Sequence, residues 1–136
     1  MQEDTRHVHN EEEVSRIRDL ADYLSNAGCP QDILVWAQVA GTSLEKKDLD
    51  RFLGIVHNFS ANPFRQEAIM VLIRLLLDSD NFDEARQFAA DLCKMEHHLF
   101  HAVARARIAK FSGDREDAAI AEEFLREFLE LYLAQK

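Results

Sequence analysis

The spacing of apolar residues limits the folds open to this chain more than any other feature of its sequence. Apolar side chains recur at intervals of three and four residues, as in Val14, Ile17, Leu20 and Leu24, and no segment shows a sustained period of two. Such spacing puts the apolar side chains on one face of an α-helix. The 136 residues include four glycines and two prolines, too few turn residues for a fold of many short strands. The sequence therefore predicts an all-α fold.

Helix-breaking residues divide the chain into about seven predicted helices. The predicted boundaries are Gly28 before Pro30, Gly41 before a Thr42–Glu45 capping box, Asn62 before Pro63, Asp80-Asn81, a break near residues 94–96, and Ser112-Gly113-Asp114. Loops this short imply that neighbouring helices are antiparallel. The helix over residues 63–78 is apolar on almost every side, so we expect it to be buried all round.

The N-terminal residues are polar and carry no helical periodicity. We expect residues 1–10 to form a flexible arm and residues 11–136 to form a single helical-repeat domain. The first residues contain neither a basic start nor an apolar stretch, and Cys29 and Cys93 lie in no short-spaced motif. A cytoplasmic protein with reduced thiols is therefore expected.

Acidic residues outnumber basic residues by 25 to 16, which gives a net charge of -9 at pH 7. Binding to nucleic acid draws its affinity from Lys and Arg side chains that neutralise phosphates, so we expect no nucleic-acid partner. No apolar run approaches the ~20 residues that cross a bilayer, so we expect no membrane association.

When the sequence is shifted along itself, segment 80–85 aligns with segment 113–118. The same shift aligns segment 47–52 with segment 80–85. Ahead of these turns Trp36, Ile69 and Ala102 align, and behind them Phe59, Leu92 and Leu125 align. A repeat of this length is typical of helical hairpins that stack in a row. We expect Leu99, Ala106 and Leu125 to face the core of such a stack.

Trp36 followed by Val39-Ala40, with an acidic pair before Ala85 and Ala118, resembles the tetratricopeptide repeat family. The resemblance covers about residues 31–128 as three degenerate copies. It implies antiparallel helical hairpins stacked as a short right-handed solenoid. Three residues depart from the family pattern, namely Phe52, Arg105 and Glu122. A helical bundle whose periodicity arises by chance is the alternative.

The resemblance also implies a function, because the first helices of stacked hairpins line a concave groove that binds a peptide or an amphipathic helix. We therefore expect a protein–protein interaction module, an adaptor or chaperone-like protein whose partner is another protein. The expected groove residues are Glu67, Met70, Arg74, Leu77, Phe100, Val103, Arg107 and Lys110. Arg74 and Arg107 are equivalent under the same shift and would together bind a carboxylate or phosphate, unless they are solvated surface charges.

The last predicted helix suggests a second function. Leu131 and Leu133 lie off the apolar stripe formed by Phe124, Phe128 and Tyr132. An end helix that stays partly apolar is typical of a contact surface. The alternative function is therefore a structural subunit or homo-oligomer, such as a homodimer, assembling through Phe128, Leu131 and Leu133, unless these residues belong to a frayed terminus.

Patterns of catalytic or metal-binding residues are scarce. Cys93, His97 and His101 are four residues apart, as ligands on one helix face would be, but the predicted break near residues 94–96 separates Cys93 from the histidines. His98 stands where a zinc-protease helix has its catalytic Glu. We therefore expect no catalytic residue, no metal, no cofactor and no enzymatic activity, with these histidines at the surface or in the groove. A metal-dependent helical enzyme using His97 and His101 is the remaining alternative.

Overall fold

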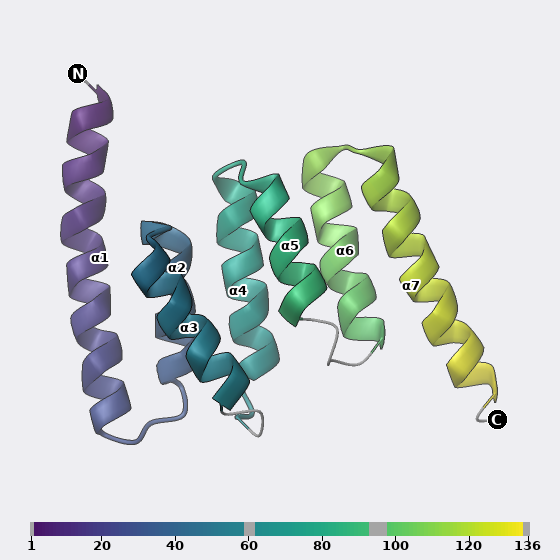
Figure 1. Cartoon of the computed structure of the whole chain (residues 1–136), viewed down its shortest axis with the longest axis horizontal. Helices are drawn as coiled ribbons and strands as arrows, with labels where there is room; N and C mark the ends of the chain where they lie inside the picture. The colour runs from purple at the N-terminus through teal and green to yellow at the C-terminus, as the bar shows by residue number, and fades with distance from the viewer. Residues whose placement is uncertain (1, 59–61, 93–97, 135–136) are drawn as a thin grey trace. The chain divides into compact units, whose positions relative to one another are not determined.

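The computed structural model of the chain consists of seven α-helices, and its described residues contain no strand (Figure 1). The structure describes the backbone of residues 2–58, 62–92 and 98–134. The helices are α1 (Gln2–Asn26), α2 (Asp32–Ser43), α3 (Lys46–Asn58), α4 (Arg65–Asp78), α5 (Phe82–Leu92), α6 (His98–Ser112) and α7 (Arg115–Ala134). The prediction of an all-α chain with about seven helices is confirmed.

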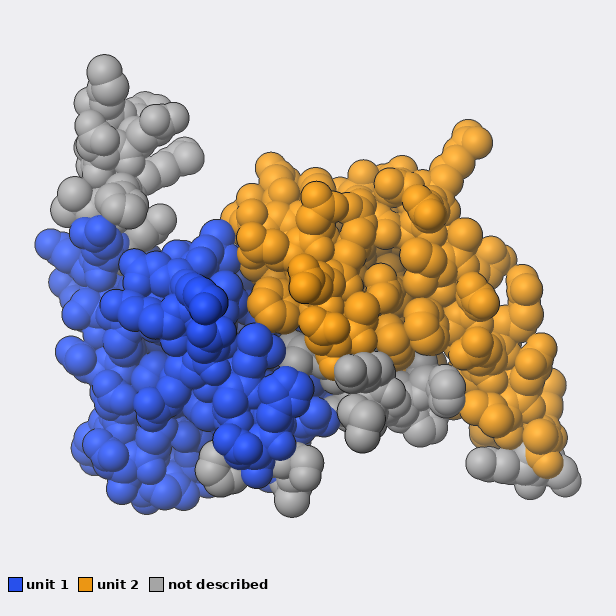
Figure 2. Space-filling model, in the orientation of Figure 1, with its two compact units in different colours: residues 1–75 blue, residues 76–136 orange. Residues whose placement is uncertain are grey.

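The chain divides into two compact units, residues 1–75 and residues 76–136 (Figure 2). The boundary lies inside α4, so that unit 1 contains α1, α2, α3 and the first turns of α4. Unit 2 contains the end of α4 together with α5, α6 and α7. The single domain over residues 11–136 stays a prediction.

The first helix is longer than its apolar stripe. α1 begins at Gln2, ahead of the first apolar residues of the predicted helix. The flexible arm over residues 1–10 stays a prediction.

The core of unit 1 forms where α1 and α3 meet α2. Trp36 is buried, and its Nε1 donates a hydrogen bond of 2.9 Å to Ser25 Oγ at the end of α1. The guanidinium of Arg51, in α3, lies 4.8 Å from the centre of the Trp36 ring, within range of a cation–π interaction. Gly28 lies just after the end of α1, as predicted. Its φ of +74° is a left-handed conformation that favours glycine.

Gly41 does not end the second helix as predicted. α2 continues to Ser43, and Gly41 is a buried residue inside it. A Cβ atom at Gly41 would lie 2.7 Å from the Cβ of Leu75 in α4. The glycine therefore provides space for a neighbouring helix rather than a helix stop. The predicted Thr42–Glu45 capping box is also wrong, because Ser43 accepts the hydrogen bond from the Glu45 amide.

In unit 2, α6 and α7 form an antiparallel hairpin (Figure 1). Gly113 has a φ of +70° and lies between the two helices, where the sequence predicted a turn. Several of the buried residues in α5, α6 and α7 are alanines, which let helices approach closely. The buried residues of these helices include Ala85, Ala89, Ala102, Ala104, Ile108 and Ala121.

Many apolar residues of α4 are buried, but Glu67 and Arg74 are exposed, so the helix is not buried all round as predicted. Ile69, Leu72, Ile73 and Leu76 have no exposed surface, and Leu77 is 2% exposed. Burying one such side chain contributes about 1.5–3 kcal/mol, so these residues are a major source of stability for the chain.

Candidate protein-interaction surface

The first turn of α3 is held to α1 by a group of three side chains, which we call the first Ser–Asp–Arg cluster. The carboxylate of Asp48 accepts hydrogen bonds from Arg18 Nε at 3.2 Å and from Arg18 Nη2 at 2.8 Å. Ser43 Oγ donates a hydrogen bond of 2.6 Å to the same carboxylate. The buried Asp48 carboxylate therefore has its hydrogen-bond partners within its own unit.

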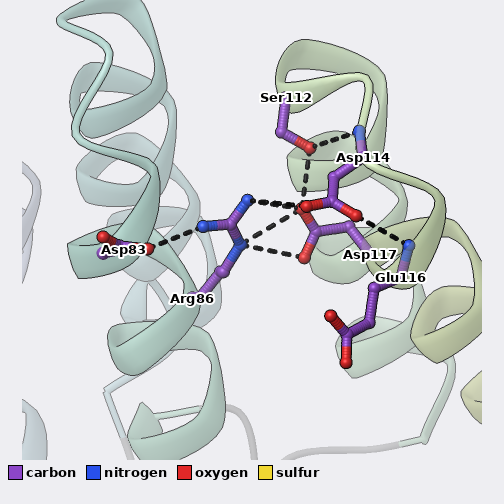
Figure 3. Close-up of polar contacts among 6 residues, drawn as sticks. All are labelled: Asp83, Arg86, Ser112, Asp114, Glu116 and Asp117. Atoms are coloured by element: carbon purple, nitrogen blue, oxygen red, sulfur yellow. Dashed lines mark hydrogen bonds and ion pairs between the residues drawn. The ribbon is translucent and has the colours of Figure 1, made fainter.

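The first turn of α7 repeats this arrangement (Figure 3). Asp117 accepts hydrogen bonds from Arg86 Nε at 2.9 Å and from Arg86 Nη2 at 2.8 Å, and Ser112 Oγ donates one of 2.7 Å. Ser112 Oγ also accepts a hydrogen bond of 3.1 Å from the amide of Asp114, as Ser43 Oγ does from Glu45. These residues form the second Ser–Asp–Arg cluster, which joins α5 to α7.

The two clusters establish which residues of the two hairpins correspond. Ser112 follows Ser43 at the same interval at which Asp117 follows Asp48. A uniform repeat would instead align Asp117 with Arg51, so the alignment predicted for the first hairpin is wrong by three positions. The physical reason is that α2 is short, and its turn comes earlier than the sequence match indicated.

Both carboxylates are held in the ionised form. Hydrogen bonds from Arg86 lower the pKa of Asp117, against the opposing effect of burial and with help from Ser112. For Asp48, burial alone would raise the pKa, but the hydrogen bonds from Arg18 and Ser43 outweigh it, and the pKa is lowered. A carboxylate with a lowered pKa and saturated oxygens is a poor proton carrier. The contacts of the two clusters hold helices together within each unit.

An apolar groove of about 190 Å³ lies between α6 and α7 and is open to solvent. Its walls, which define the α6–α7 groove, are Leu99, Ala102, Val103, Ala106, Ala121, Glu122 and Leu125. Leu99 is 41% exposed, and Val103 and Leu125 are each 42% exposed. Side chains of this kind gathered in one groove are typical of a surface that another helix covers.

The corresponding surface of the α2–α3 hairpin is covered. When the two hairpins are aligned on their Ser–Asp–Arg clusters, Val56 corresponds to Leu125. Val56 is completely buried. Its carbonyl accepts a hydrogen bond of 3.1 Å from Arg65 Nε at the start of α4. Gly41, which corresponds to Lys110, is the residue against which Leu75 of α4 packs. Two similar hairpins thus differ in that one is covered by a helix and the other exposes its groove.

The end of α7 extends the apolar surface. Leu129, Leu131, Tyr132 and Leu133 are all exposed, whereas Phe128 is half-buried and its ring lies 6.0 Å from that of Tyr132. Leu131 and Leu133, two of the three residues predicted to contact a partner, are thus at the surface. That a partner covers Leu131 and Leu133 stays a prediction.

The predicted first-helix groove is divided between the two units. Glu67, Met70 and Arg74 belong to unit 1, with Met70 half-buried and the other two exposed. Leu77 is 2% exposed and is therefore not accessible to a partner. The four remaining residues lie on α6, half-buried in the first case and exposed in the others: Phe100, Val103, Arg107 and Lys110.

Of the predicted groove residues, Val103 lines the α6–α7 groove. We expected Leu99, Ala106 and Leu125 in the core, but all three are exposed. Their helical spacing is that of core residues, and spacing alone does not show whether another helix covers that face. The sequence contains no signal that separates these three residues from core residues.

His101 is buried, contrary to the expectation of a surface or groove histidine. Its ring stacks on Phe124 with 3.9 Å between centroids, and its Nε2 accepts a hydrogen bond of 3.4 Å from Arg105 Nε. Cys93 and His97 lie outside the described residues. Within the described part of the chain, no three potential ligands come together at a metal site.

Comparisons with protein-family models, with curated proteins and with solved structures find no match to this chain. In the part of the chain that the structure describes, no helix combines the length and the apolar character needed to cross a bilayer.

Proposed function

We propose that this chain is a protein-interaction module that binds a helical surface of a protein partner in the α6–α7 groove. The observation that carries the proposal is the exposure of Val103 and Leu125 in one apolar groove, whose counterpart in unit 1 is covered by α4. Each Å² of apolar surface removed from water stabilises a complex by about 25 cal/mol before the costs of association.

The proposal includes the tetratricopeptide-like solenoid implied by the sequence. It is supported by the recurrence of the Ser–Asp–Arg cluster in the two hairpins. In a stack of hairpins each hairpin packs its apolar face against a neighbour, so an apolar groove that stays exposed in the described residues is available to a partner. An adaptor or chaperone-like protein uses such a face to hold its partner, and this role requires no catalytic residue.

Site-specific photo-crosslinking tests the proposal. A photoreactive amino acid at Leu125, in the full chain and in its native cells, should form a covalent adduct with another polypeptide. The matched control is the same amino acid at Glu123, which is exposed on the opposite side of α7 and should form none. Equal labelling from both positions, or adducts from neither, would contradict the proposal.

A further inference from the structure

We infer that the α6–α7 groove binds an amphipathic helix of another protein whose apolar stripe is bordered by acidic residues. The inference rests on the proposed function, and it names the chemistry of the partner from the charges around the groove. An apolar groove alone fits many helices, whereas the charges at its edges decide which of them bind.

Basic side chains border the groove on both helices. On α6, Arg107 lies four residues after Val103, and on α7, Arg126 lies four residues after Glu122. Residues four apart are neighbours on a helix surface, so each base lies beside a wall of the groove. Two further bases follow the same faces toward the Gly113 turn, namely Lys110 on α6 and Arg115 on α7. We call these four residues the basic rim.

The side chains of the basic rim are available to a partner. All four residues are exposed, and none of their side chains forms an ion pair or hydrogen bond with another described residue. A carboxylate from a partner can therefore pair with them without breaking a contact within the described chain.

Acidic side chains are few on the groove side of the hairpin. Glu122 lines the groove, and Arg126, four residues later, offsets its charge. The sequence of α6 contains no acid. Four exposed acids of α7 follow one another at intervals of seven, four and three residues, which places them on the side opposite Leu125: Glu116, Glu123, Glu127 and Glu130. The groove side thus has an excess of positive charge in a chain whose net charge is -9.

The helix that covers the equivalent groove in unit 1 indicates how a partner helix meets this rim. The first residue of α4 donates a hydrogen bond to the carbonyl of Val56, and further along α4 Leu75 packs against Gly41. In the alignment of the two Ser–Asp–Arg clusters, Val56 corresponds to Leu125 and Gly41 corresponds to Lys110. A helix that covers the α6–α7 groove in the manner of α4 therefore passes Leu125 first and Lys110 later.

Lys110 requires a different residue on the covering helix from the one that Gly41 accepts. An added Cβ at Gly41 would lie 2.7 Å from the Cβ of Leu75, so the two helices of unit 1 touch at this point. A lysine in the corresponding position keeps a covering helix farther away and presents an ammonium group to it. An apolar residue there would remove the ammonium group from water without a partner, whereas a carboxylate pairs with it. The partner helix therefore carries an acidic residue toward its C-terminal end.

Helices with other charges are less complementary to the groove. A helix with basic edges brings like charges against Arg107 and Arg126, which repel it and slow its approach. A helix with uncharged edges gains the apolar contact alone. The basic rim therefore selects a helix with acidic edges.

Binding of three synthetic peptides to the full chain tests the inference. Each peptide is an amphipathic helix of ~18 residues, about five turns, with the same stripe of leucines. Glu borders the stripe in the first peptide, Gln in the second and Lys in the third. Fluorescence anisotropy should show that the Glu peptide binds at least about tenfold more tightly than the Gln peptide and that the Lys peptide binds most weakly. Added salt should reduce this preference, because it screens charges at the surface.

Substitutions in the basic rim should reverse the preference. Arg107→Glu combined with Lys110→Glu should weaken binding of the Glu peptide at least about tenfold and strengthen binding of the Lys peptide. The matched control is Arg16→Glu combined with Lys46→Glu, which changes the net charge equally at exposed residues of α1 and α3 and should leave binding unchanged. Leu125→Glu should weaken binding of all three peptides, because it places a charge in the apolar contact. Circular dichroism shows that each variant is folded.

Equal affinities for the three peptides, or a tighter Lys peptide, would overturn the inference. So would a Glu peptide that fails to bind up to sub-millimolar concentration or that is indifferent to Leu125→Glu. Photo-crosslinking from Leu125 in cells separates this failure from failure of the proposed function. Adducts with a basic or uncharged segment, or with a second copy of this chain, would refute the acidic helix and retain the groove as a binding surface. The lack of any adduct would refute both.

Discussion

Arg86 in α5 and Asp117 in α7 are 31 residues apart in the sequence and face each other through two short hydrogen bonds, 2.9 Å from Nε and 2.8 Å from Nη2. The same relationship joins Arg18 to Asp48 in unit 1. In both cases the Arg lies on a helix that precedes the hairpin, and the Asp lies in the first turn of the hairpin's second helix. The Arg therefore holds three consecutive helices together.

Asp117→Asn should destabilise the chain. The amide cannot balance the Arg86 charge, and loss of a charged hydrogen-bond partner costs about 2–3 kcal/mol. The measurement is urea unfolding followed by circular dichroism. Asp83→Asn is the matched control, because Asp83 also contacts Arg86, at 2.7 Å, but its side chain is 99% exposed. Equal effects of the two substitutions would show that the second cluster contributes no more than a surface ion pair.

Acidification should weaken the fold through the same clusters. The pKa values of Asp48 and Asp117 are lowered in the folded chain, so the unfolded chain binds protons first as the pH falls. Their contribution is complete above the unfolded pKa of about 4, and it is lost as the pH falls through their folded pKa values. We expect a variant carrying both Asp48→Asn and Asp117→Asn to be less stable at neutral pH and less sensitive to acid. Urea unfolding at a series of pH values checks this, and parallel pH profiles would contradict it.

Gly41→Ala should destabilise the chain although alanine is the better helix former. The added Cβ would lie 2.7 Å from the Cβ and Cδ1 of Leu75, and such overpacking costs about 1–3 kcal/mol. Gly54→Ala in α3 provides the opposite case, since no atom lies within 4 Å of its added Cβ. That substitution should stabilise the chain by about 0.5–1 kcal/mol. Thermal unfolding shows whether each substitution lowers or raises the stability of the chain. A change in the same direction for both variants would refute the contact with Leu75.

Charge reversal distinguishes the two possible partner surfaces. If the first-helix groove predicted from the sequence holds the partner, the combined substitutions Arg74→Glu and Arg107→Glu should reduce partner capture several-fold without unfolding the chain. If the α6–α7 groove holds it, Leu125→Glu should have the larger effect, because it places a charge in an apolar contact. Crosslinking yield from a probe at Val103, which belongs to both surfaces, measures capture in each variant. Unchanged capture in both would exclude both surfaces.

The sequence by itself determined the features that depend on neighbouring residues. The spacing of apolar residues predicted an all-α chain, and Gly28 and Gly113 marked helix ends because the left-handed conformation there favours glycine. The burial of Ile69, Leu72, Ile73 and Leu76 in α4 also followed from its apolar composition, although Glu67 and Arg74 leave one side of the helix exposed.

Only the tertiary structure decided what depends on residues far apart in the chain. Gly41 has the local appearance of a helix stop, but its contact with Leu75 makes it a packing residue. Nothing in the sequence distinguishes Arg86 and Asp117 from surface charges, and only the packing of α5 and α7 brings them into contact. Leu125 has the spacing of a core residue, but it is 42% exposed in the folded chain. Periodicity records which side of a helix is apolar, whereas the tertiary structure determines what covers that side.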